Sequence, residues 1–373
     1  MNVIAIYPGI AKEKNDNAYT LLRLQERGVK LTMIAGKSLG LKGKGQLPSC
    51  ENMDGISVHR LYRNLWEMLF LPNKHFNEVI EITKDLKPDL ILCVQEFNMR
   101  IALKLQKIFN VPIVLQVEDA GRIYWGKAYS LKFRLLLRAI GLPSGRKFWP
   151  WLCSKASVII TCHPRDQLIS KELSQFGAPI HYIPWPTSIP DNFKALSPKD
   201  HYRGVYIGSL YPFKNTQEFE STIPRILNET PTREFLIVGP GPHAKIAKNL
   251  QKTTNGKVRY ITELSRSDAL QLIASSYYAY TPVKKGGWGF LGDCWTMGTP
   301  IAMTHNDSYV TDMETALVAN ETYDLIKNIN RLYSDSALYE RLVKQGYLES
   351  QARSTKVVGD AMYDIFSKTI SAD

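Results

Sequence analysis

Short apolar runs alternate with amphipathic segments through the first half of the chain. Residues 3–7 and 29–35 have the composition of buried strands, and residues 18–27 between them have the spacing of a helix that ends at Gly28. This strand–helix–strand order is how a doubly wound parallel sheet begins. The pattern continues and predicts further strands at 56–62, 90–94, 112–117 and 158–161, with further helices at 77–86 and 99–109.

A second alternating series follows a proline-rich stretch that has no hydrophobic periodicity. The fold class predicted is therefore α/β, with two doubly wound, Rossmann-like domains of residues 1–186 and 202–354 and a linker of residues 187–201. A last helix of about residues 355–373 can pack back on the first domain. Strands of the second series are expected at 204–208, 235–238, 258–261, 277–281 and 301–304, and helices at 217–227, 243–251 and 267–274.

One stretch of the second domain has the features of an anion site. Residues 282–300, PVKKGGWGFLGDCWTMGTP, follow an expected strand and contain Gly286, Gly287 and Gly289 beside two lysines. A helical segment from about residue 291 then carries one acid, Asp293. A flexible turn that enters a helix N-terminus offers backbone N–H groups and a positive dipole end to a phosphate. Glycines needed only for the turns of a loop explain this stretch equally well.

Polar residues follow two neighbouring strands of the first domain. Gln95 and Glu96 come after one strand, and Glu118 and Asp119 come after the next. Because ligands of such sheets bind beyond the carboxyl ends of the strands, these four residues are our acceptor-side candidates. Each acid taken alone fits a helix cap or a solvated loop residue better. Gly9, which follows the first strand, is a candidate for the donor side.

Length and cysteine content narrow the class of protein. At 373 residues the chain exceeds what one hydrophobic core usually supports. Its five cysteines form no CxxC pair, which suits a reducing compartment and argues against a zinc site.

The N-terminus has the character of a strand rather than a signal peptide, and no apolar run approaches the roughly 20 residues of a membrane span. We expect a cytoplasmic protein, either free or bound to the cytoplasmic face of the membrane.

The net charge of +12 is concentrated in the first half of the chain. Residues 1–186 hold 26 Lys and Arg against 15 Asp and Glu, a balance of +11, whereas residues 187–373 hold 21 against 20. The first domain is therefore suited to an anionic partner: a membrane surface, a phosphorylated or lipid-linked acceptor, or nucleic acid. A basic surface that serves only solubility is the alternative.

Residues 127–151 are the most unusual part of the first half. Apolar residues alternate there with Lys132, Arg134 and Arg138, and the sequence FWPW follows. A basic amphipathic helix with tryptophans nearby is typical of segments that lie at a membrane interface. An ordinary helix that packs on the core and exposes its charges fits the pattern at least as well.

Three motifs of the second half resemble a known enzyme family. Gly208, Ser209 and Lys214 lie in a stretch similar to the G-R-L-x-x-x-K-G loop of retaining GT-B glycosyltransferases, the family that includes sucrose synthase and glycogen synthase. Residues 236–241, with Gly239 and Gly241, match the L-x-V-G-x-G strand and turn of this family. Residues 183–193 are similar to its linker motif. The resemblance implies a GT-B fold and a nucleoside diphosphate sugar as donor substrate.

The glycine-rich stretch resembles the E-x7-E segment of the same family. Counting back from Gly298 and Pro300 places the second acid of that segment at Asp293, which the resemblance implies to bind the ribose of the nucleotide. Trp288 and Gly289 correspond to the aromatic–glycine pair. The first glutamate, implied to contact the donor sugar, is replaced by Lys285 or Gly286. The donor-binding set therefore comprises Gly9, Gly208, Ser209, Lys214, Gly239, Gly241, Lys285, Gly286, Gly287, Trp288, Gly289, Phe290 and Asp293.

The chemistry implied needs a leaving diphosphate that is stabilised as charge develops on it. Lys214, Lys284 or Lys285, and the backbone N–H groups of residues 286–290 are suited to this task. No Asp-x-Asp triplet occurs in the sequence, so we expect no metal and no cofactor. Lys214, Glu118 and Asp119 are the catalytic candidates. In the retaining reaction of the family, the diphosphate itself helps to take the proton of the acceptor.

Three functions remain open at this point. The first is a retaining hexosyltransferase for glycan biosynthesis, which acts on a lipid-linked or membrane-associated acceptor. The second is the same enzyme acting on modified DNA, whose phosphates would also suit a basic groove. The third is a catalytically silent subunit that binds a nucleotide sugar, for which the missing first glutamate is the main support.

Overall fold

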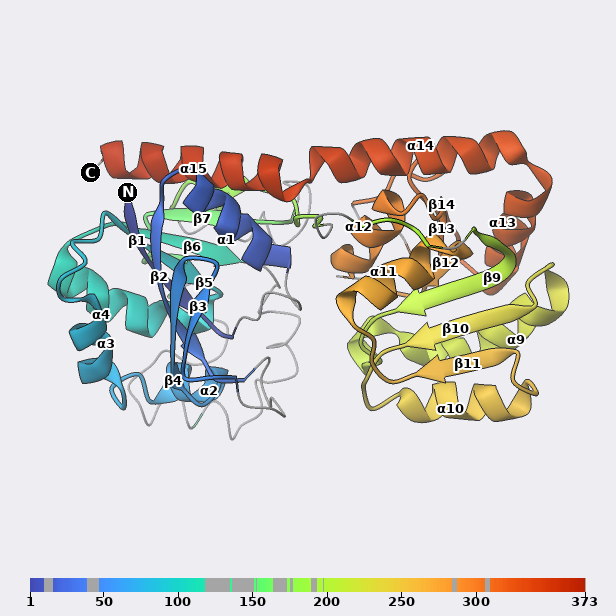
Figure 1. Cartoon of the computed structure of the whole chain (residues 1–373), viewed down its shortest axis with the longest axis horizontal. Coiled ribbons are helices and arrows are strands. Elements are labelled where there is room, and N and C mark those ends of the chain that lie inside the picture. Colours follow the sequence, from blue (N-terminus) through green and yellow to red (C-terminus); the bar gives the residue numbers. More distant parts are fainter. Residues whose placement is uncertain are drawn as a thin grey trace. The chain divides into compact units, whose positions relative to one another are not determined.

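The computed structural model of the chain describes two compact units (Figure 1). The first comprises Met1–Pro184 together with Thr355–Asp373, and the second comprises Trp185–Ser354. The residues that the structure describes are 1–9, 16–38, 47–117, 135, 151, 153–163, 173–174, 177–188, 193–196, 198–283, 287–305 and 309–372.

An eight-stranded sheet forms the centre of the first unit. Its order is β3-β4-β2-β1-β5-β6-β7-β8, and every pair is parallel except the antiparallel pair of β3 and β4. The strands are β1 (Asn2–Tyr7), β2 (Lys30–Gly36), β3 (Cys50–Met53), β4 (Ile56–Tyr62), β5 (Leu90–Val94), β6 (Ile113–Val117), β7 (Val158–Thr161) and β8 (Ile180–Tyr182).

Both faces of this sheet are buried, as the continuous apolar runs of the strands require. Successive side chains of a strand point to opposite faces. Along β1, Ile4 and Ile6 belong to one core cluster, whereas Val3, Ala5 and Tyr7 belong to the other. The helices that accompany the sheet are α1 (Asp16–Glu26), α2 (Leu65–Phe70), α3 (Phe76–Thr83), η2 (Glu96–Asn98) and α4 (Met99–Phe109).

The C-terminal helix α15 (Thr355–Ala372) belongs to the first unit and lies along α1 (Figure 1). Gly359 allows the close approach, since a Cβ at this position would lie 2.5 Å from the Cγ of Arg23. Asp360 accepts from the Arg23 guanidinium and lies 3.6 Å from that of Arg27. Val358, Met362 and Phe366 of α15 complete the core on this face of the sheet.

The second unit contains a six-stranded sheet that is parallel throughout. Its order is β11-β10-β9-β12-β13-β14. The strands are β9 (Asp200–Ile207), β10 (Glu234–Val238), β11 (Val258–Ile261), β12 (Ser276–Thr281), β13 (Ile301–Met303) and β14 (Leu317–Val318). The other elements are η5 (Pro212–Lys214), η6 (Thr216–Glu218), α9 (Phe219–Glu229), α10 (Ala244–Thr253), α11 (Arg266–Ala274), α12 (Trp288–Thr296), α13 (Thr322–Ser334) and α14 (Ser336–Ala352).

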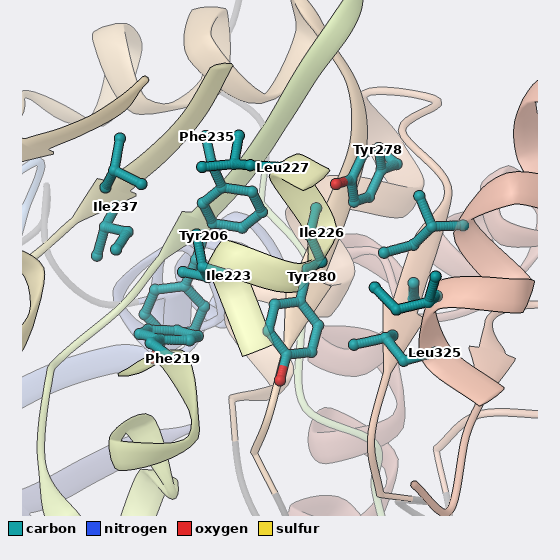
Figure 2. Close-up of a cluster of buried hydrophobic side chains, with 14 of the residues drawn as sticks. Tyr206, Phe219, Ile223, Ile226, Leu227, Phe235, Ile237, Tyr278, Tyr280 and Leu325 are labelled. Carbon is teal, nitrogen blue, oxygen red and sulfur yellow. The ribbon is translucent and has the colours of Figure 1, made fainter. Parts of the chain in front are cut away.

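Aromatic side chains fill the core between α9 and this sheet (Figure 2). The Tyr206 ring of β9 lies 4.9 Å from the Phe219 ring, centre to centre. Tyr280 of β12 lies 5.8 Å from Phe219 and 6.3 Å from Phe235. These edge-to-face pairs are the arrangement that ring quadrupoles favour, so the strands and α9 are held in one register.

The predicted α/β class with two Rossmann-like domains is confirmed. The antiparallel strand β3 was not predicted, because its sequence CENM lacks the apolar run of the parallel strands. Strand β9 begins at Asp200, so the last two residues of the predicted linker already belong to the second sheet. The predicted interfacial segment, residues 127–151, lies outside the described residues except for Leu135 and Trp151.

Candidate active site

Loops that follow the strands of the second sheet meet at its carboxyl edge. Residues 208–218 follow β9, 239–243 follow β10, 282–283 and 287 follow β12, and 304–305 follow β13. In a parallel doubly wound sheet this edge is where ligands bind. Most of the residues predicted for the donor lie on these loops or at the start of α12.

The loops after β9 and β10 are joined by backbone hydrogen bonds. Leu210 N–H donates to the Pro240 carbonyl (2.8 Å), and His243 N–H donates to the Leu210 carbonyl (3.0 Å). The contact is so close that a Cβ on Gly239 would lie 2.0 Å from the Gly208 oxygen, and one on Gly241 would lie 2.3 Å from the Leu210 oxygen. Both glycines also have positive φ values, +138° and +152°. The fold of this edge itself therefore requires these two glycines.

Lys214 is the last residue of η5 and lies in a tight turn between β9 and α9, which we call the Lys214 turn (residues 211–217). Its N–H donates to the Tyr211 carbonyl (2.9 Å), and its side chain is half-buried. The next residue, Asn215, has φ +57°, a conformation that suits the glycine of the family motif and that asparagine tolerates. The Thr216 hydroxyl lies 2.9 Å from His243 Nδ1, at the start of α10. The turn is thus bonded to the neighbouring loop.

The helix α12 begins at Trp288, three residues earlier than predicted. Gly287 is its N-cap with φ +82°, and the first intrahelical bond runs from Leu291 N–H to the Gly287 carbonyl (3.1 Å). The first N–H groups of an α-helix point along its axis and form the positive end of its dipole. An anion at this position would meet the backbone of Trp288 and Gly289. Lys284, Lys285 and Gly286 lie outside the described residues.

Aromatic contacts bring the start of α12 close to the start of α9. The Phe290 ring lies 5.5 Å from the Tyr206 ring, and Phe219 contacts the same ring at 4.9 Å. Two helix N-termini therefore lie beside one buried tyrosine. On the other side, the Trp288 ring lies 5.0 Å from Tyr309 and 5.9 Å from Trp185.

Asp293, predicted for the ribose, lies in the second turn of α12 and forms a bidentate ion pair. Both of its oxygens accept from the Arg266 guanidinium at 2.6 Å, and the residue is only 8% exposed. Arg266 also donates to the Ser188 carbonyl (3.0 Å). An ionised carboxylate has about four lone-pair sites, so it can accept hydroxyl groups as well. Its role toward the ribose stays a prediction.

The candidates of the first unit lie at the carboxyl ends of β1 and β5. A Cβ on Gly9 would lie 2.3 Å from the Ser38 oxygen, so this glycine is required by the loop after β2. Gln95 has φ +63° and precedes η2, and Glu96 is buried, with 1% exposed. Burial, with the nearby charge of Glu96 adding to it, raises the pKa of the Cys93 thiol. The acceptor-side role of Gln95 and Glu96 stays a prediction.

Glu118 and Asp119 lie outside the described residues, so their acceptor-side and catalytic roles also stay predictions. Within the described ranges, no group of three His, Cys, Asp or Glu side chains is arranged to hold a metal ion. No helix of this part of the chain is long and apolar enough to cross a membrane.

Sequence reasoning missed a cluster at the same edge. The Glu218 carboxylate lies 3.0 Å from His305 Nε2 and accepts from the Thr304 hydroxyl at 2.9 Å. It also accepts from the side-chain amide of Asn215. An acid just before α9 and a histidine just after β13 were visible in the sequence as residues at strand and helix ends. Their separation of 87 positions gave no indication that they pair.

Comparisons with known proteins agree with this geometry. Residues 201–335 match the sequence profile of the family described as Glycosyl transferases group 1. No curated protein sequence matches the chain. Sucrose-phosphate synthase (tll1590) from Thermosynechococcus elongatus has a similar structure, with 16% sequence identity, a TM-score of 0.73 and coverage of 100% of both chains.

Two further solved structures are similar along nearly their whole length. Anabaena Alr3699/HepE in complex with UDP and glucose has 14% identity and a TM-score of 0.69, over 99% of this chain and 100% of that one. An alpha-glucosyltransferase in complex with UDP-glucose and DNA containing an abasic site has 14% identity and a TM-score of 0.59, over 98% and 99%. At such identities the likeness establishes the fold.

The predicted resemblance to GT-B glycosyltransferases is therefore confirmed. The match to the sequence profile covers the whole edge described above, from β9 to α13. The chain has the GT-B fold, and its residues 201–335 match the family described as Glycosyl transferases group 1.

Proposed function

We propose that the chain transfers a hexose, with retention of configuration, from a nucleoside diphosphate sugar to a lipid-linked or membrane-associated glycan. The observation that carries this proposal is the carboxyl edge of the second sheet. There a helix N-terminus preceded by a left-handed glycine, Gly287, and a lysine on a fixed turn, Lys214, lie within the part of the chain that matches the glycosyl transferases group 1 family.

The donor diphosphate would be bound by the first turn of α12 and by Lys214. Negative charge develops on the diphosphate as the bond between the sugar C1 and the phosphate oxygen breaks, and preorganised N–H groups and a cation stabilise that charge. A bond from the acceptor hydroxyl oxygen to C1 forms on the same face of the sugar. The hydroxyl proton passes to the departing diphosphate, so the step is balanced without a further base. Asp293 would accept the ribose hydroxyls.

The acceptor would be bound by the basic first half of the chain. Its balance of +11 over residues 1–186 favours an anionic partner, and Gln95, Glu96, Glu118 and Asp119 are the residues proposed to meet the acceptor glycan. A peripheral position at the cytoplasmic membrane face through residues 127–151 belongs to the same proposal. Anabaena HepE, solved with UDP and glucose, supports the choice of a UDP-hexose as the first donor to test.

A thermal-shift panel of nucleotide sugars tests the donor side. A ligand at a hundred times its dissociation constant stabilises the native state by about 2.7 kcal/mol. We expect one nucleoside diphosphate hexose to raise the melting temperature. Slow hydrolysis of that donor would identify an enzyme, and binding without any release of nucleotide would identify the silent subunit instead.

Membrane binding is tested separately with anionic liposomes. The triple substitution K132A/R134A/R138A should reduce cosedimentation with the vesicles and leave donor binding unchanged. Equal recovery of wild type and variant in the vesicle-free fraction would refute the membrane part of the proposal.

Modified DNA is the second candidate acceptor. The alpha-glucosyltransferase that was solved with DNA has the same fold, and the charge of residues 1–186 suits phosphates equally well. A protein that contacts several phosphates loses affinity steeply with salt. Retention on DNA with such a slope, together with sugar transfer to it, would favour this acceptor over a glycan.

A further inference from the structure

Three side chains bond the Glu218 carboxylate. One oxygen accepts from the Thr304 hydroxyl (2.9 Å). The other oxygen accepts from the Asn215 amide and lies 3.0 Å from His305 Nε2. The Glu218 side chain is 29% exposed and that of His305 is 24% exposed, so the cluster lies at the surface of the carboxyl edge.

The cluster joins two loops that come from different strands. Glu218 ends η6 at the N-cap position of α9, where a negative charge is favourable to the helix dipole. Thr304 and His305 directly follow β13, and β12 lies between β9 and β13 in the sheet. The bonds of Glu218 therefore reach across the end of β12.

The buried tyrosine of β12 shows how close the carboxylate lies to the sheet. Burial raises the pKa of Tyr280, and the charge of Glu218 raises it further. Tyr280 is fully buried, and its ring packs against Phe219, the residue after Glu218. Figure 2 shows its hydroxyl at the end of the core cluster that lies away from Tyr278. The carboxylate thus lies near the buried phenol of Tyr280.

Asn215 links the Glu218 carboxylate to the Lys214 turn. Its side-chain amide donates to Glu218, its side-chain oxygen accepts from Gln217 Nε2 (2.5 Å), and its own N–H donates to the Pro212 carbonyl (3.0 Å). Asn215 is 9% exposed and holds a left-handed conformation directly after Lys214. A glycine at this position would lack the side chain that reaches Glu218.

We propose that Glu218, held by Thr304 and His305, is a positioning residue that fixes Lys214 for the leaving diphosphate through Asn215. This inference rests on the proposed function, in which Lys214 stabilises the charge of that diphosphate. Glu218 contacts no donor atom in this role. Glu218 determines the position of the Lys214 backbone relative to the end of β13.

A double-mutant cycle tests the inference, with UDP affinity and the rate of donor hydrolysis as readouts. Glu218→Ala should weaken UDP binding and lower the rate by about tenfold, within the range of coupling between residues in contact. Glu218→Gln should restore most of the loss, because its carbonyl oxygen can still accept from Asn215. In the Lys214→Ala background, Glu218→Ala should have no further effect.

Glu220→Ala is the matched control. Glu220 is exposed in the first turn of the same helix, so this variant removes an equal charge without touching the cluster. It should match the wild type in UDP affinity and in rate, and its melting temperature should fall only slightly, because one favourable charge at the helix start is lost. Because Glu218→Ala also removes an acceptor from Asn215, its melting temperature is measured beside each rate.

Two results overturn the inference while the proposed function stands. If the wild type binds UDP and the losses from Lys214→Ala and Glu218→Ala multiply, Glu218 does not act through Lys214 and the inference fails alone. The inference also fails alone if Glu218→Ala binds UDP and hydrolyses the donor like the wild type. If the wild type binds no nucleoside diphosphate, the proposed function fails, and the inference fails with it.

Discussion

At the scale of single residues, Asp293 has a structural task besides the one proposed toward the donor. Its bidentate pair with Arg266 joins α12 to α11. Arg266 also donates to the Ser188 carbonyl, which ties both helices to the segment that precedes the second sheet. A carboxylate held this way has a fixed orientation, which suits a group that must meet ribose hydroxyls. Loss of donor binding in an Asp293 variant therefore has two causes to separate.

Asp293→Ala should lower the free energy of unfolding by about 3 kcal/mol, because it leaves the Arg266 charge poorly compensated in a mostly buried place. The double variant D293A/R266M should recover much of this stability, since the unpaired charge is gone. Urea denaturation measures both. If the double variant regains stability but still binds no donor, Asp293 has a direct role in the site; an intact donor affinity would assign it to structure alone.

Gly239 and Gly256 form a matched pair for the loop contact at the carboxyl edge. Both have positive φ, but a Cβ on Gly239 would strike the Gly208 oxygen at 2.0 Å, whereas one on Gly256 meets nothing within 4 Å. Gly256→Ala should therefore lower the free energy of unfolding by about 1 kcal/mol, because alanine disfavours the positive φ of this position. Gly239→Ala should lower the free energy of unfolding by about 3 kcal/mol, because its φ is less accessible to alanine and the added Cβ clashes with backbone. Equal losses in urea denaturation would contradict the close approach of the two loops.

At the scale of elements, α12 is fixed by a close contact with the segment that precedes the second sheet. A Cβ on Gly292 would lie 2.6 Å from Thr187 Oγ1, and Thr187 N–H donates to the Arg353 carbonyl at the end of α14 (2.8 Å). The Trp295 indole donates to the Thr315 carbonyl (2.7 Å) and secures the other end of the helix. These contacts set the position of the N-terminus that is proposed to bind the diphosphate.

Gly292→Ala tests this packing against helix propensity. Alanine should stabilise a helix interior by up to about 1 kcal/mol relative to glycine. We expect the reverse: the free energy of unfolding should fall by about 2 kcal/mol, because the added methyl group clashes with the Thr187 hydroxyl. Adding Thr187→Ala should restore stability, since it removes the atom that clashes. A stabilised Gly292→Ala variant would show that α12 does not pack so closely on Thr187.

The bounds of four elements could be predicted from the sequence to the residue. Leu90–Val94, Met99–Phe109, Val158–Thr161 and Val258–Ile261 have the bounds that were predicted. Each of these segments ends at a polar residue or a turn, so only one pair of bounds fits the sequence. The start of α12 was missed because its N-cap, Gly287, has no side chain that could form a capping bond, and it is one of three nearby glycines.

The site was predictable only where its residues are close in sequence. Counting back from Gly298 and Pro300 located Asp293, but its partner Arg266 lies 27 positions away on α11. The partners of Glu218 come from the end of β13, 86 and 87 positions away. Pairs of this kind depend on strand order, which follows from packing of the whole sheet. The roles proposed for Gln95, Glu96, Glu118 and Asp119 rest on strand ends alone and stay predictions.

At the scale of the whole molecule, buried and half-buried tyrosines contribute to the response of the chain to alkaline conditions. Burial raises the pKa of Tyr333 to about 12, and it raises the pKa values of Tyr206, Tyr278, Tyr280 and Tyr339 as well. All five belong to the second unit. In the unfolded chain they ionise near pH 10, so above that pH the unfolded state binds fewer protons and becomes more stable relative to the native one.

The free energy of unfolding should therefore be constant with respect to these groups below about pH 10 and should fall as the pH rises from about 10 to about 12. Tyr333→Phe should make this fall shallower, because one of the shifted groups is gone. Tyr323→Phe is the control, since that tyrosine is 67% exposed. Urea denaturation at several pH values gives both slopes. Equal slopes for Tyr333→Phe and the wild type would contradict a raised pKa of the half-buried Tyr333 phenol.

The carboxyl edge of the second sheet is central to everything proposed for this chain, because the donor must bind there. Calorimetric titration of the wild type and of Lys214→Ala with UDP and with UDP-hexoses tests this directly. We predict that the wild type binds UDP and at least one UDP-hexose with one site per chain, and that Lys214→Ala weakens both by about tenfold, as the loss of a charge-assisted contact would. A wild-type chain that binds none of these ligands, or a Lys214→Ala variant that binds them as tightly as the wild type, would contradict a nucleotide-sugar site at this edge.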